Sequence, residues 1–410
     1  MPNLRKIAVF ILSPLHALLQ IVVPPVQNMV SYTSIPDYSD NAFYQYLHLL
    51  RTRKSLVHVW IVRDKRVHQR IEAQFAVLLS GVARDLPIAA DHRLIIANKF
   101  SFRGYWLYLR SVVVYHTHGS YAWCRTAIRR EIVCLWHGMP IKCIGRQNTR
   151  EPNAVITYGS RHIATSDFYR PVIADSFGCV ESQVAVSSLP RCDALHYADV
   201  PIHSREQVRN HLSVGPGEYL LLWLPTYRKQ TESADSLLND ARTFLDDLDP
   251  SQVEYLQQQA LMHRCKIVVK LHPLDAANFI PDPQIADGLP VIKSDDWQRS
   301  GMQLYDLLAA SDALISDVSS VVIDFMTLGR PIGIFGFDAS QYPRDLVLPI
   351  EEFRRSACVI FLDTQTAIQD LFRRLQQDRH TGSRNDSLRN RLYPQFTTRG
   401  AEAMAQLAGL

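Results

Sequence analysis

The apolar positions of the chain form short continuous runs that alternate with segments of helical spacing. In the first half, six runs predict buried strands: Met29–Tyr32, Val57–Val62, Leu94–Ala97, Val112–Tyr115, Ile132–Trp136 and Ala154–Tyr158. Between them, Asn41–Arg51 and Arg66–Leu79 repeat apolar residues every three or four positions, which is typical of helices packed on one face. Strands that alternate with helices predict a parallel, doubly wound α/β sheet.

The same alternation begins again in the second half. The predicted strands are Tyr219–Leu224, Lys266–Leu271, Ala313–Ile315 and Pro331–Phe335, and the predicted helices are Ser251–His263, Tyr305–Ala310 and one that begins at Val321. A chain of 410 residues is long for one core, and prolines and glycines cluster in Asp199–Gly217. We therefore expect an N-terminal domain at 1–200 and a C-terminal domain at 201–375. Residues 376–410 form a helical segment, for which a return to the first domain is one option.

Residues 1–25 are apolar, and their placement is open from sequence. Arg5 and Lys6 precede Ile7–Val23, a run interrupted by Pro14, His16 and Gln20. A helix packed on the first domain, a helix on a membrane surface and a membrane span all fit this pattern, although the run is marginal in length for a span. No small-residue cleavage site follows, which argues against a signal peptide.

Charge and cysteine content narrow the class of protein. The formal net charge of +4 suits anionic ligands or an acidic membrane face, but it is too small to indicate nucleic-acid binding. The seven cysteines include no CxxC pair, so they indicate a reducing cytoplasm and offer neither a zinc site nor a disulfide framework.

Polar residues follow four of the predicted strands, at positions that an open parallel sheet directs toward its ligand crevice. These islands contain His137; Arg228; Lys270 with His272; and Ser319 and Ser320 with Asp317 and Asp324. His137 has the side chain of a general base near neutral pH, although a strand-end histidine can also simply bond a loop carbonyl. Arg228, Lys270 and His272 can bind phosphate or lie solvated at the surface.

The serine turn has two interpretations as well. Ser319 and Ser320 stand at a helix start, where they can seat a phosphate or cap the helix. Asp324 lies one helical turn deeper and needs a partner, either a backbone turn or a substrate hydroxyl. A base in one half and cationic donors in the other predict a group transferase that acts on a nucleotide diphosphate.

With these islands in order, the chain resembles the CDP-glycerol glycerophosphotransferase family, which includes teichoic acid polymerases and primases and related capsule polymerases. The resemblance runs from about residue 30 to 340. Its pieces are Asp40-Asn41, Trp60, LWHGMPIK at 135–142, SDFYRPVIADSFG at 166–178, LPRCDAL at 189–195, LPTYR at 224–228, KLHP at 270–273, SDALISDVSSVVIDFMTLGRPIGIF at 311–335, and Asp338.

The resemblance implies a GT-B fold of two Rossmann-like domains with an interdomain cleft. The first domain then binds the acceptor and the second a CDP-linked donor. By the same resemblance, His137 is the base and His272 a second catalytic residue that contacts the donor diphosphate with Arg228. Lys270, Asp317, Ser319, Ser320 and Asp324 complete the donor side, and Gly138, Lys142, Asp167 and Arg191 the acceptor side.

The implied reaction transfers glycerol phosphate from CDP-glycerol to a hydroxyl of a glycan or growing polymer and releases CMP. CDP-ribitol as donor and a GT-B glycosyltransferase that uses a nucleotide sugar stay open as alternatives, and a non-catalytic nucleotide- or glycan-binding relative is less favoured because His137 is present. The family usually has Tyr where Val318 stands, so the donor polyol is open.

The expected partners are a CDP-polyol donor, a glycan or lipid-linked acceptor and a membrane surface, without nucleic acid. No cofactor is firmly implied and no metal ligand is assigned, although a divalent ion such as Mg²⁺ is compatible with the chemistry. Asp247-Leu248-Asp249 has the DxD spacing of some metal-dependent transferases, in a segment expected to be solvated. We expect a cytoplasmic protein, peripheral on the inner face of the cytoplasmic membrane.

Overall fold

The computed structural model divides the chain into two compact units. It describes residues 4–79, 91–149, 156–225, 249–271, 289–292, 294–317, 319–335, 345–377 and 386–410. Unit 1 comprises Met1–Ile202, Arg344–Val347 and Arg391–Leu410, and unit 2 comprises His203–Pro343 and Leu348–Asn390. Unit 1 therefore contains the C-terminal end of the chain as well as its first half.

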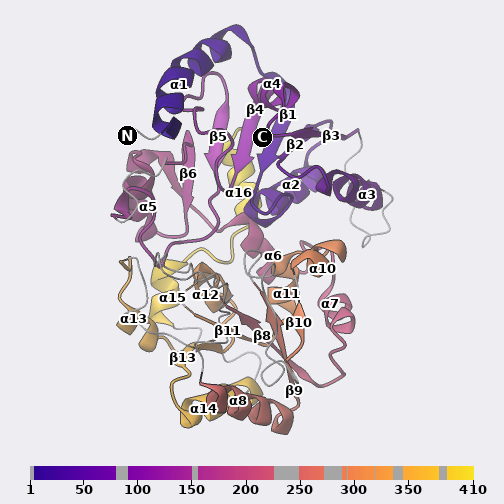
Figure 1. Ribbon diagram of the computed structural model, residues 1–410, viewed down its shortest axis with the longest axis vertical. Helices are drawn as coiled ribbons and strands as arrows, with labels where there is room; N and C mark the ends of the chain where they lie inside the picture. The colour runs from indigo at the N-terminus through magenta and orange to yellow at the C-terminus, as the bar shows by residue number, and fades with distance from the viewer. Residues whose placement is uncertain are drawn as a thin grey trace, which may run out of the picture. The chain divides into compact units, whose positions relative to one another are not determined.

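Unit 1 is built on a parallel sheet of seven strands (Figure 1). The strands are β1 Val26–Thr33, β2 Val57–Val62, β3 Arg93–Asn98, β4 Ser111–His116, β5 Glu131–Cys134, β6 Arg161–Ala164 and β7 Val184–Val186. Their order β3-β2-β1-β4-β5-β6-β7 reverses between β1 and β4. In such a sheet the point of reversal is where ligands bind, beyond the carboxyl ends of the strands.

The strand predicted at Ala154–Tyr158 is wrong in its described part. Residues 156–158 form no strand, and pairing with β5 begins at Ser160, whose N–H donates to Ile132 O at 2.8 Å. The Tyr158 carbonyl instead lies 2.9 Å from Nε2 of the His116 ring. The next strand is β6, whose buried His162 stacks on Phe177 at 4.9 Å. A polar residue in the core explains why the apolar pattern missed β6.

The helices of unit 1 flank this sheet. They are α1 Leu4–Val22, α2 Asp40–Thr52, α3 Val67–Leu79, α4 Phe102–Arg110, α5 Tyr169–Phe177, α6 Asp193–His196 and α16 Gly400–Leu407. Tyr46 of α2 packs edge-on against Tyr32 of β1 at 5.4 Å, and Tyr32 stacks on Trp60 of β2 at 5.2 Å. All three rings are fully buried, so this cluster fixes α2 over the central strands.

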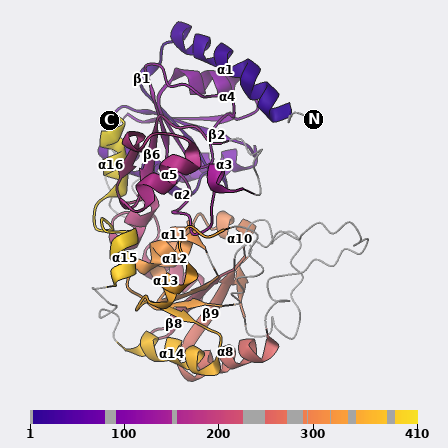
Figure 2. The same cartoon turned by 90° about the vertical axis from the view of Figure 1, so that its left-hand side faces the viewer.

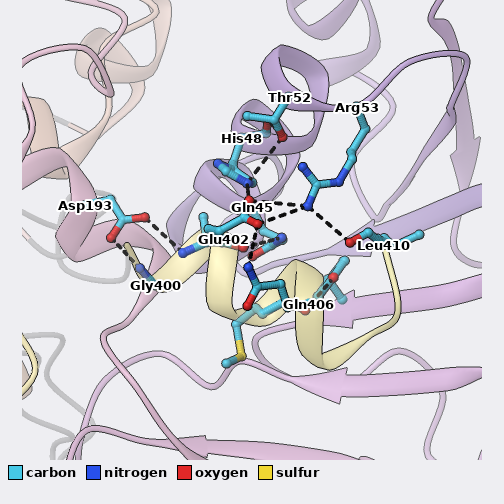
Figure 3. Close-up of polar contacts among 12 residues, drawn as sticks. Gln45, His48, Thr52, Arg53, Asp193, Gly400, Glu402, Gln406 and Leu410 are labelled. Carbon is cyan, nitrogen blue, oxygen red and sulfur yellow. Dashed lines mark hydrogen bonds and ion pairs between the residues drawn. The ribbon is translucent and has the colours of Figure 1, made fainter. Parts of the chain in front are cut away.

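The C-terminal helix α16 docks on α2 through polar contacts (Figure 3). The Asp193 carboxylate accepts hydrogen bonds from the backbone N–H groups of Gly400 at 2.7 Å and Ala401 at 2.9 Å. Gln45 of α2 donates to the Ala401 carbonyl at 3.0 Å. A Cβ on Gly400 would lie 2.3 Å from the Ser188 carbonyl oxygen, so this approach requires glycine.

Unit 2 repeats the same topology with six parallel strands. They are β8 Tyr219–Leu224, β9 Cys265–Lys270, β10 Val291–Ile292, β11 Ala313–Ser316, β12 Ile332–Ile334 and β13 Val359–Phe361, in the order β10-β9-β8-β11-β12-β13. The order reverses between β8 and β11. The α/β class predicted from the alternating runs is confirmed in both units.

The helices of unit 2 cover its sheet. They are α7 Arg205–His211, α8 Pro250–Met262, α10 Ser294–Arg299, α11 Leu304–Ala310, α12 Ser320–Met326, α13 Ile350–Arg354 and α14 Gln365–Gln376, and α15 Ser387–Leu392 connects unit 2 to unit 1. Helices α8 and α14 lie side by side (Figures 1 and 2). Together with the strands, these two helices form a hydrophobic core, to which Leu221, Val253 and Phe372 contribute.

Buried histidines make the stability of unit 1 sensitive to acid. Burial lowers the pKa of His58 and His116 to about 3, and of His16 and His162 to about 4. The unfolded chain therefore binds more protons below about pH 6.5, and each ring costs about 2 kcal/mol of unfolding free energy at pH 5. We expect the midpoint of thermal unfolding to fall clearly from pH 7 to pH 5.

Asp193 has the opposite effect on the unfolding free energy. Between pH 7 and pH 5 it offsets the loss caused by about one of these histidines. Burial raises its pKa to about 7, so its contribution is present in acid and is lost as the pH rises through 7. Replacing His58 by Phe should reduce the acid dependence of the unfolding midpoint. A midpoint that stays constant or rises between pH 7 and pH 5 contradicts this account.

Candidate active site

His137 lies on a sharp turn just beyond β5. The strand ends at Cys134, two residues earlier than predicted, because Trp136 has φ +52° and Gly138 has φ +123°. Left-handed backbone is costly for a non-glycine residue such as Trp136 and persists only where neighbouring contacts hold it. The turn brings the partly buried His137 ring to the carboxyl edge of the sheet.

Two segments far apart in the sequence hold this turn. Asn41 of α2 donates through Nδ2 to the Trp136 carbonyl at 2.9 Å and, through Oδ1, accepts from the Arg191 backbone N–H at 3.1 Å. Arg191 donates through Nη1 to the His137 carbonyl at 2.9 Å and to Asp40 Oδ1 at 2.7 Å. We call Asp40, Asn41 and Arg191 the turn clamp. Its members come from two of the motifs that carry the family resemblance.

The charged pair of the turn clamp is largely removed from water. The side chains of Arg191 and Asp40 are 6% and 13% exposed. Asp40 also has a left-handed backbone, with φ +61°, where α2 begins. A charge pair in this setting is costly to break, because either partner is left buried and unpaired.

A second histidine, His118, stacks on the ring of His137. The two ring centroids are 4.1 Å apart and the planes differ by 4°. His118 follows β4, and its Nδ1 lies 2.8 Å from the Thr117 hydroxyl. Sequence reasoning missed it, although it also follows an apolar run, Val112–Tyr115, by the rule that identified His137.

The surroundings keep the His137 imidazole neutral. Burial lowers its pKa to about 4; the Asp40 carboxylate raises the pKa and the Arg191 guanidinium lowers it. Burial and then the neighbouring His137 lower the pKa of His118 well below its usual value. His137 Nδ1 has no hydrogen-bond partner among the described residues. A neutral imidazole at a strand end can accept a proton from a bound hydroxyl.

The other residues predicted for the acceptor side lie at different distances from this centre. Gly138 forms part of the turn, and Lys142 lies further along the loop in a β-bridge to Leu346. Asp167 follows β6, is 85% exposed in its side chain and pairs with Arg170 at 3.0 Å. Gly138 and Arg191 therefore lie at the His137 turn, whereas Asp167 pairs with Arg170 at the surface.

In unit 2, the predicted donor-side residues lie at the carboxyl ends of β9 and β11. Lys270 ends β9, and burial lowers its pKa to about 8. Ser319 precedes α12 and its hydroxyl accepts from the Val321 N–H at 3.5 Å, the contact of a helix cap. Asp317 and Ser320 flank Ser319 in this turn. Arg228 and His272 lie outside the described residues.

The buried Asp324 has a partner that neither sequence-based alternative named. The Tyr305 hydroxyl of α11 donates to Asp324 Oδ2 at 2.5 Å. Asp324 is fully buried, and Tyr305 is 3% exposed. This bond ties α12 to α11 behind the serine turn, which is a structural task for the carboxylate.

The described part of the chain contains no cluster of metal-binding side chains. No group of three or more His, Cys, Asp or Glu side chains there is arranged to hold an ion. Within the predicted DxD segment, Asp249 caps α8 by accepting from the Ser251 N–H at 2.9 Å. Asp247 and Leu248 lie outside the described residues.

Residues 15–403 match the CDP-glycerol:poly(glycerophosphate) glycerophosphotransferase family. The chain belongs to this family. By its description, this family is one of transferases. The match covers the turn clamp, His137 and the serine turn of unit 2, and it confirms the resemblance read from the motifs.

Individual relatives are distant in sequence. A teichoic acid glycerol-phosphate transferase of Staphylococcus aureus is 21% identical over 86% of this chain and 85% of its own length. The ribitol-phosphate polymerase TarK of the same organism is 23% identical over 55% of this chain and 42% of its own length. The chain thus spans about two fifths of the first curated relatives it matches.

The solved structure of the wall teichoic acid polymerase TagF is similar in fold. It aligns with a TM-score of 0.71 and 15% identity over 99% of this chain and 96% of the other. This likeness, with the two parallel sheets, confirms the predicted GT-B fold.

No helix among the described residues combines the length and the apolar character that crossing a bilayer requires.

Proposed function

We propose that the protein transfers a polyol phosphate, most directly glycerol phosphate, from a CDP-linked donor to an acceptor hydroxyl. The observation that carries the proposal is the turn that presents His137, whose backbone the turn clamp holds beside the topological switch point of unit 1. Family membership supports the donor class. In addition, one TagF structure was obtained after a soak with CDPG.

The proposed reaction is a displacement at phosphorus. The acceptor hydroxyl gives its proton to His137, and its oxygen bonds to the phosphorus that carries the polyol. The bond from that phosphorus to the bridging oxygen breaks, and CMP leaves with the electron pair. Positioned cations lower the barrier by balancing the charge that develops on the phosphate oxygens.

We assign the acceptor to unit 1 and the donor to unit 2. Lys270, Ser319 and Ser320 stand at the strand ends of unit 2 that face a ligand in this fold class. Asp317 belongs to the same turn, and the family resemblance adds Arg228 and His272.

Donor screening tests the proposed function directly. CDP-glycerol, CDP-ribitol and common nucleotide sugars are each incubated with the full chain and a hydroxyl acceptor, and the released nucleotide is quantified. We expect CMP from CDP-glycerol. CDP-ribitol is the second candidate donor, because the first two curated relatives are ribitol-phosphate polymerases. Release of UDP from nucleotide sugars alone would replace the proposal with a glycosyltransferase.

We also propose that α1 docks on an anionic membrane surface. Its polar side chains face the protein: His16 and Gln20 are fully buried. His16 Nδ1 lies 2.8 Å from the Tyr105 hydroxyl of α4, and Gln20 Nε2 donates to the Thr126 carbonyl at 2.8 Å. The helix is thus fixed to unit 1 by the face that an ordinary surface helix exposes.

The opposite face of α1 is an apolar stripe. Phe10, Ile11, Leu15, Leu18, Ile21 and Val22 are between 52% and 83% exposed. Helix α4 lies beside α1 and adds Phe102 and Trp106, which are 81% and 43% exposed (Figures 1 and 2). The exposed Arg129 donates to the Ile21 carbonyl at 2.8 Å and so places a cation at the end of the stripe. Apolar side chains bordered by a cation suit an anionic bilayer.

Vesicle co-sedimentation tests this docking. We expect the protein to sediment with vesicles that contain phosphatidylglycerol. The double substitution Leu18→Glu, Ile21→Glu should reduce the bound fraction at least about tenfold, because it places two charges where apolar side chains would enter the bilayer. The matched control is Leu261→Glu, Met262→Glu on α8, where both residues are more than 60% exposed. Equal binding by the two double variants contradicts the proposal. A wild-type dimer that only the α1 variant dissociates would assign the stripe to a second copy.

A further inference from the structure

Two cations stand at the carboxyl edge of the unit 1 sheet, close to the stacked histidines. Arg63 follows β2, and Lys99 follows β3. The Lys99 ammonium donates to the Gly119 carbonyl at 3.3 Å, and Gly119 comes directly after His118. Lys99 therefore reaches from the end of the edge strand β3 to the loop after β4, and β4 is the neighbour of β5, which His137 follows.

Neither cation is neutralised by an ion pair within the described residues. The Arg63 side chain is exposed and makes no hydrogen bond to a described residue. Asp37 interacts electrostatically with both cations but forms no ion pair with them, and its carboxylate accepts the backbone N–H groups of Arg63 at 2.7 Å and Asp64 at 2.9 Å. The turn clamp differs, because there Arg191 is matched by Asp40.

The two positive charges act on each other and on the histidines. Burial, followed by the charge of Arg63, lowers the pKa of Lys99 to about 8. Arg63 also contributes to the lowered pKa of His118. An anion bound between them would relieve this repulsion, and it would lie next to the His118–His137 pair.

We propose that Arg63 and Lys99 form an anion subsite that binds a phosphate group of the acceptor, adjacent to the hydroxyl that His137 deprotonates. This inference rests on the proposed function and specifies its acceptor: a chain end that already carries a phosphodiester. A guanidinium and an ammonium from neighbouring strands supply several donors to the oxygens of one phosphate. A neutral glycan end offers them no such partner.

The test compares two acceptors in the full chain. One is a short synthetic glycerol phosphate oligomer, and the other is an uncharged glycoside that ends in glycerol. We expect Arg63→Gln and Lys99→Gln each to raise KM for the oligomer about tenfold or more, since each removes a charge-assisted contact. We expect kcat, KM for CDP-glycerol and KM for the uncharged glycoside to stay within about twofold of wild type, because the subsite contacts neither donor nor base.

The matched controls are Arg93→Gln and Lys54→Gln. Both residues are exposed at the amino ends of the same two strands, where Arg93 begins β3 and Lys54 precedes β2. Each control removes the same charge as its test variant from the opposite edge of the sheet. We expect neither control to change KM for either acceptor.

Calorimetry of the oligomer with the full chain, without donor, separates this inference from the proposed function. If CDP-glycerol is not turned over but Arg63→Gln weakens oligomer binding while Arg93→Gln does not, the subsite stands and the proposed function fails. The subsite is overturned if the Arg63 and Lys99 variants raise KM for both acceptors equally, or if they raise KM for CDP-glycerol instead. It is also overturned if a glycoside that ends in a uronate binds the wild-type protein as tightly as the oligomer does.

Discussion

Replacing His137 with alanine is expected to reduce CMP release from CDP-glycerol by about 10²–10⁴-fold, the usual contribution of a general base. The ring is the neutral, partly buried imidazole of the site, and the turn clamp holds its backbone rather than its side chain. The substitution therefore removes the base and leaves the turn in place. KM or Kd for CDP-glycerol should change by less than about twofold, because the donor is assigned to unit 2.

A matched histidine variant sharpens this result. His211→Ala removes an exposed imidazole from α7 of unit 2 and should leave kcat unchanged. Circular dichroism and the unfolding midpoint of His137→Ala should resemble those of the wild type. Turnover near the wild-type rate in His137→Ala removes His137 from the chemistry, and the assigned mechanism with it.

Replacing Arg191 with alanine is expected to lower the unfolding free energy of unit 1 by about 3–5 kcal/mol. Asp40 is then left with a largely buried, unpaired carboxylate, and the His137 carbonyl loses its donor. We expect kcat to fall as well, since the turn that orients the ring is no longer held on that side. Urea unfolding and CMP release measure the two effects.

A double-mutant cycle shows whether the pair acts as a unit. Asp40→Ala and Arg191→Ala should each be destabilising, and the double variant should cost clearly less than their sum. Arg170→Ala provides the comparison, because its pair with the 85% exposed Asp167 lies at the surface and should contribute at most about 1 kcal/mol. Additive effects of Asp40→Ala and Arg191→Ala would show that the turn clamp is not an energetic unit.

Much of the fold was predictable because the strands are buried on both faces. Val57–Val62 was predicted with the bounds that β2 has, and Ala313–Ile315 differs from β11 by one residue. Continuous apolar runs identify such strands without further information. β6 was missed because its His162 is accommodated by stacking on Phe177, a contact that exists only after α5 has packed.

The candidate site was only partly predictable, for a related reason. A polar residue at a strand end identified His137, and the family resemblance added Arg191, but nothing local indicates that Arg191 bonds the His137 carbonyl or that His118 stacks on the ring. These contacts join residues from β4, β5 and a later turn. They depend on the order of the strands in the sheet. In the same way, the partner of Asp324 became known only when α11 was placed against α12.

The sequence by itself determined the two-unit α/β organisation, the family and the chemical character of the strand ends, because these depend on the order and spacing of residue types. The tertiary structure decided which face of α1 is buried. From its composition, an apolar helix interrupted by His16 and Gln20 is expected to bury its apolar residues, yet those two polar side chains bond α4 and the Thr126 carbonyl while the apolar stripe faces outward. Buried polar groups need specific partners, and only the packed chain supplies them.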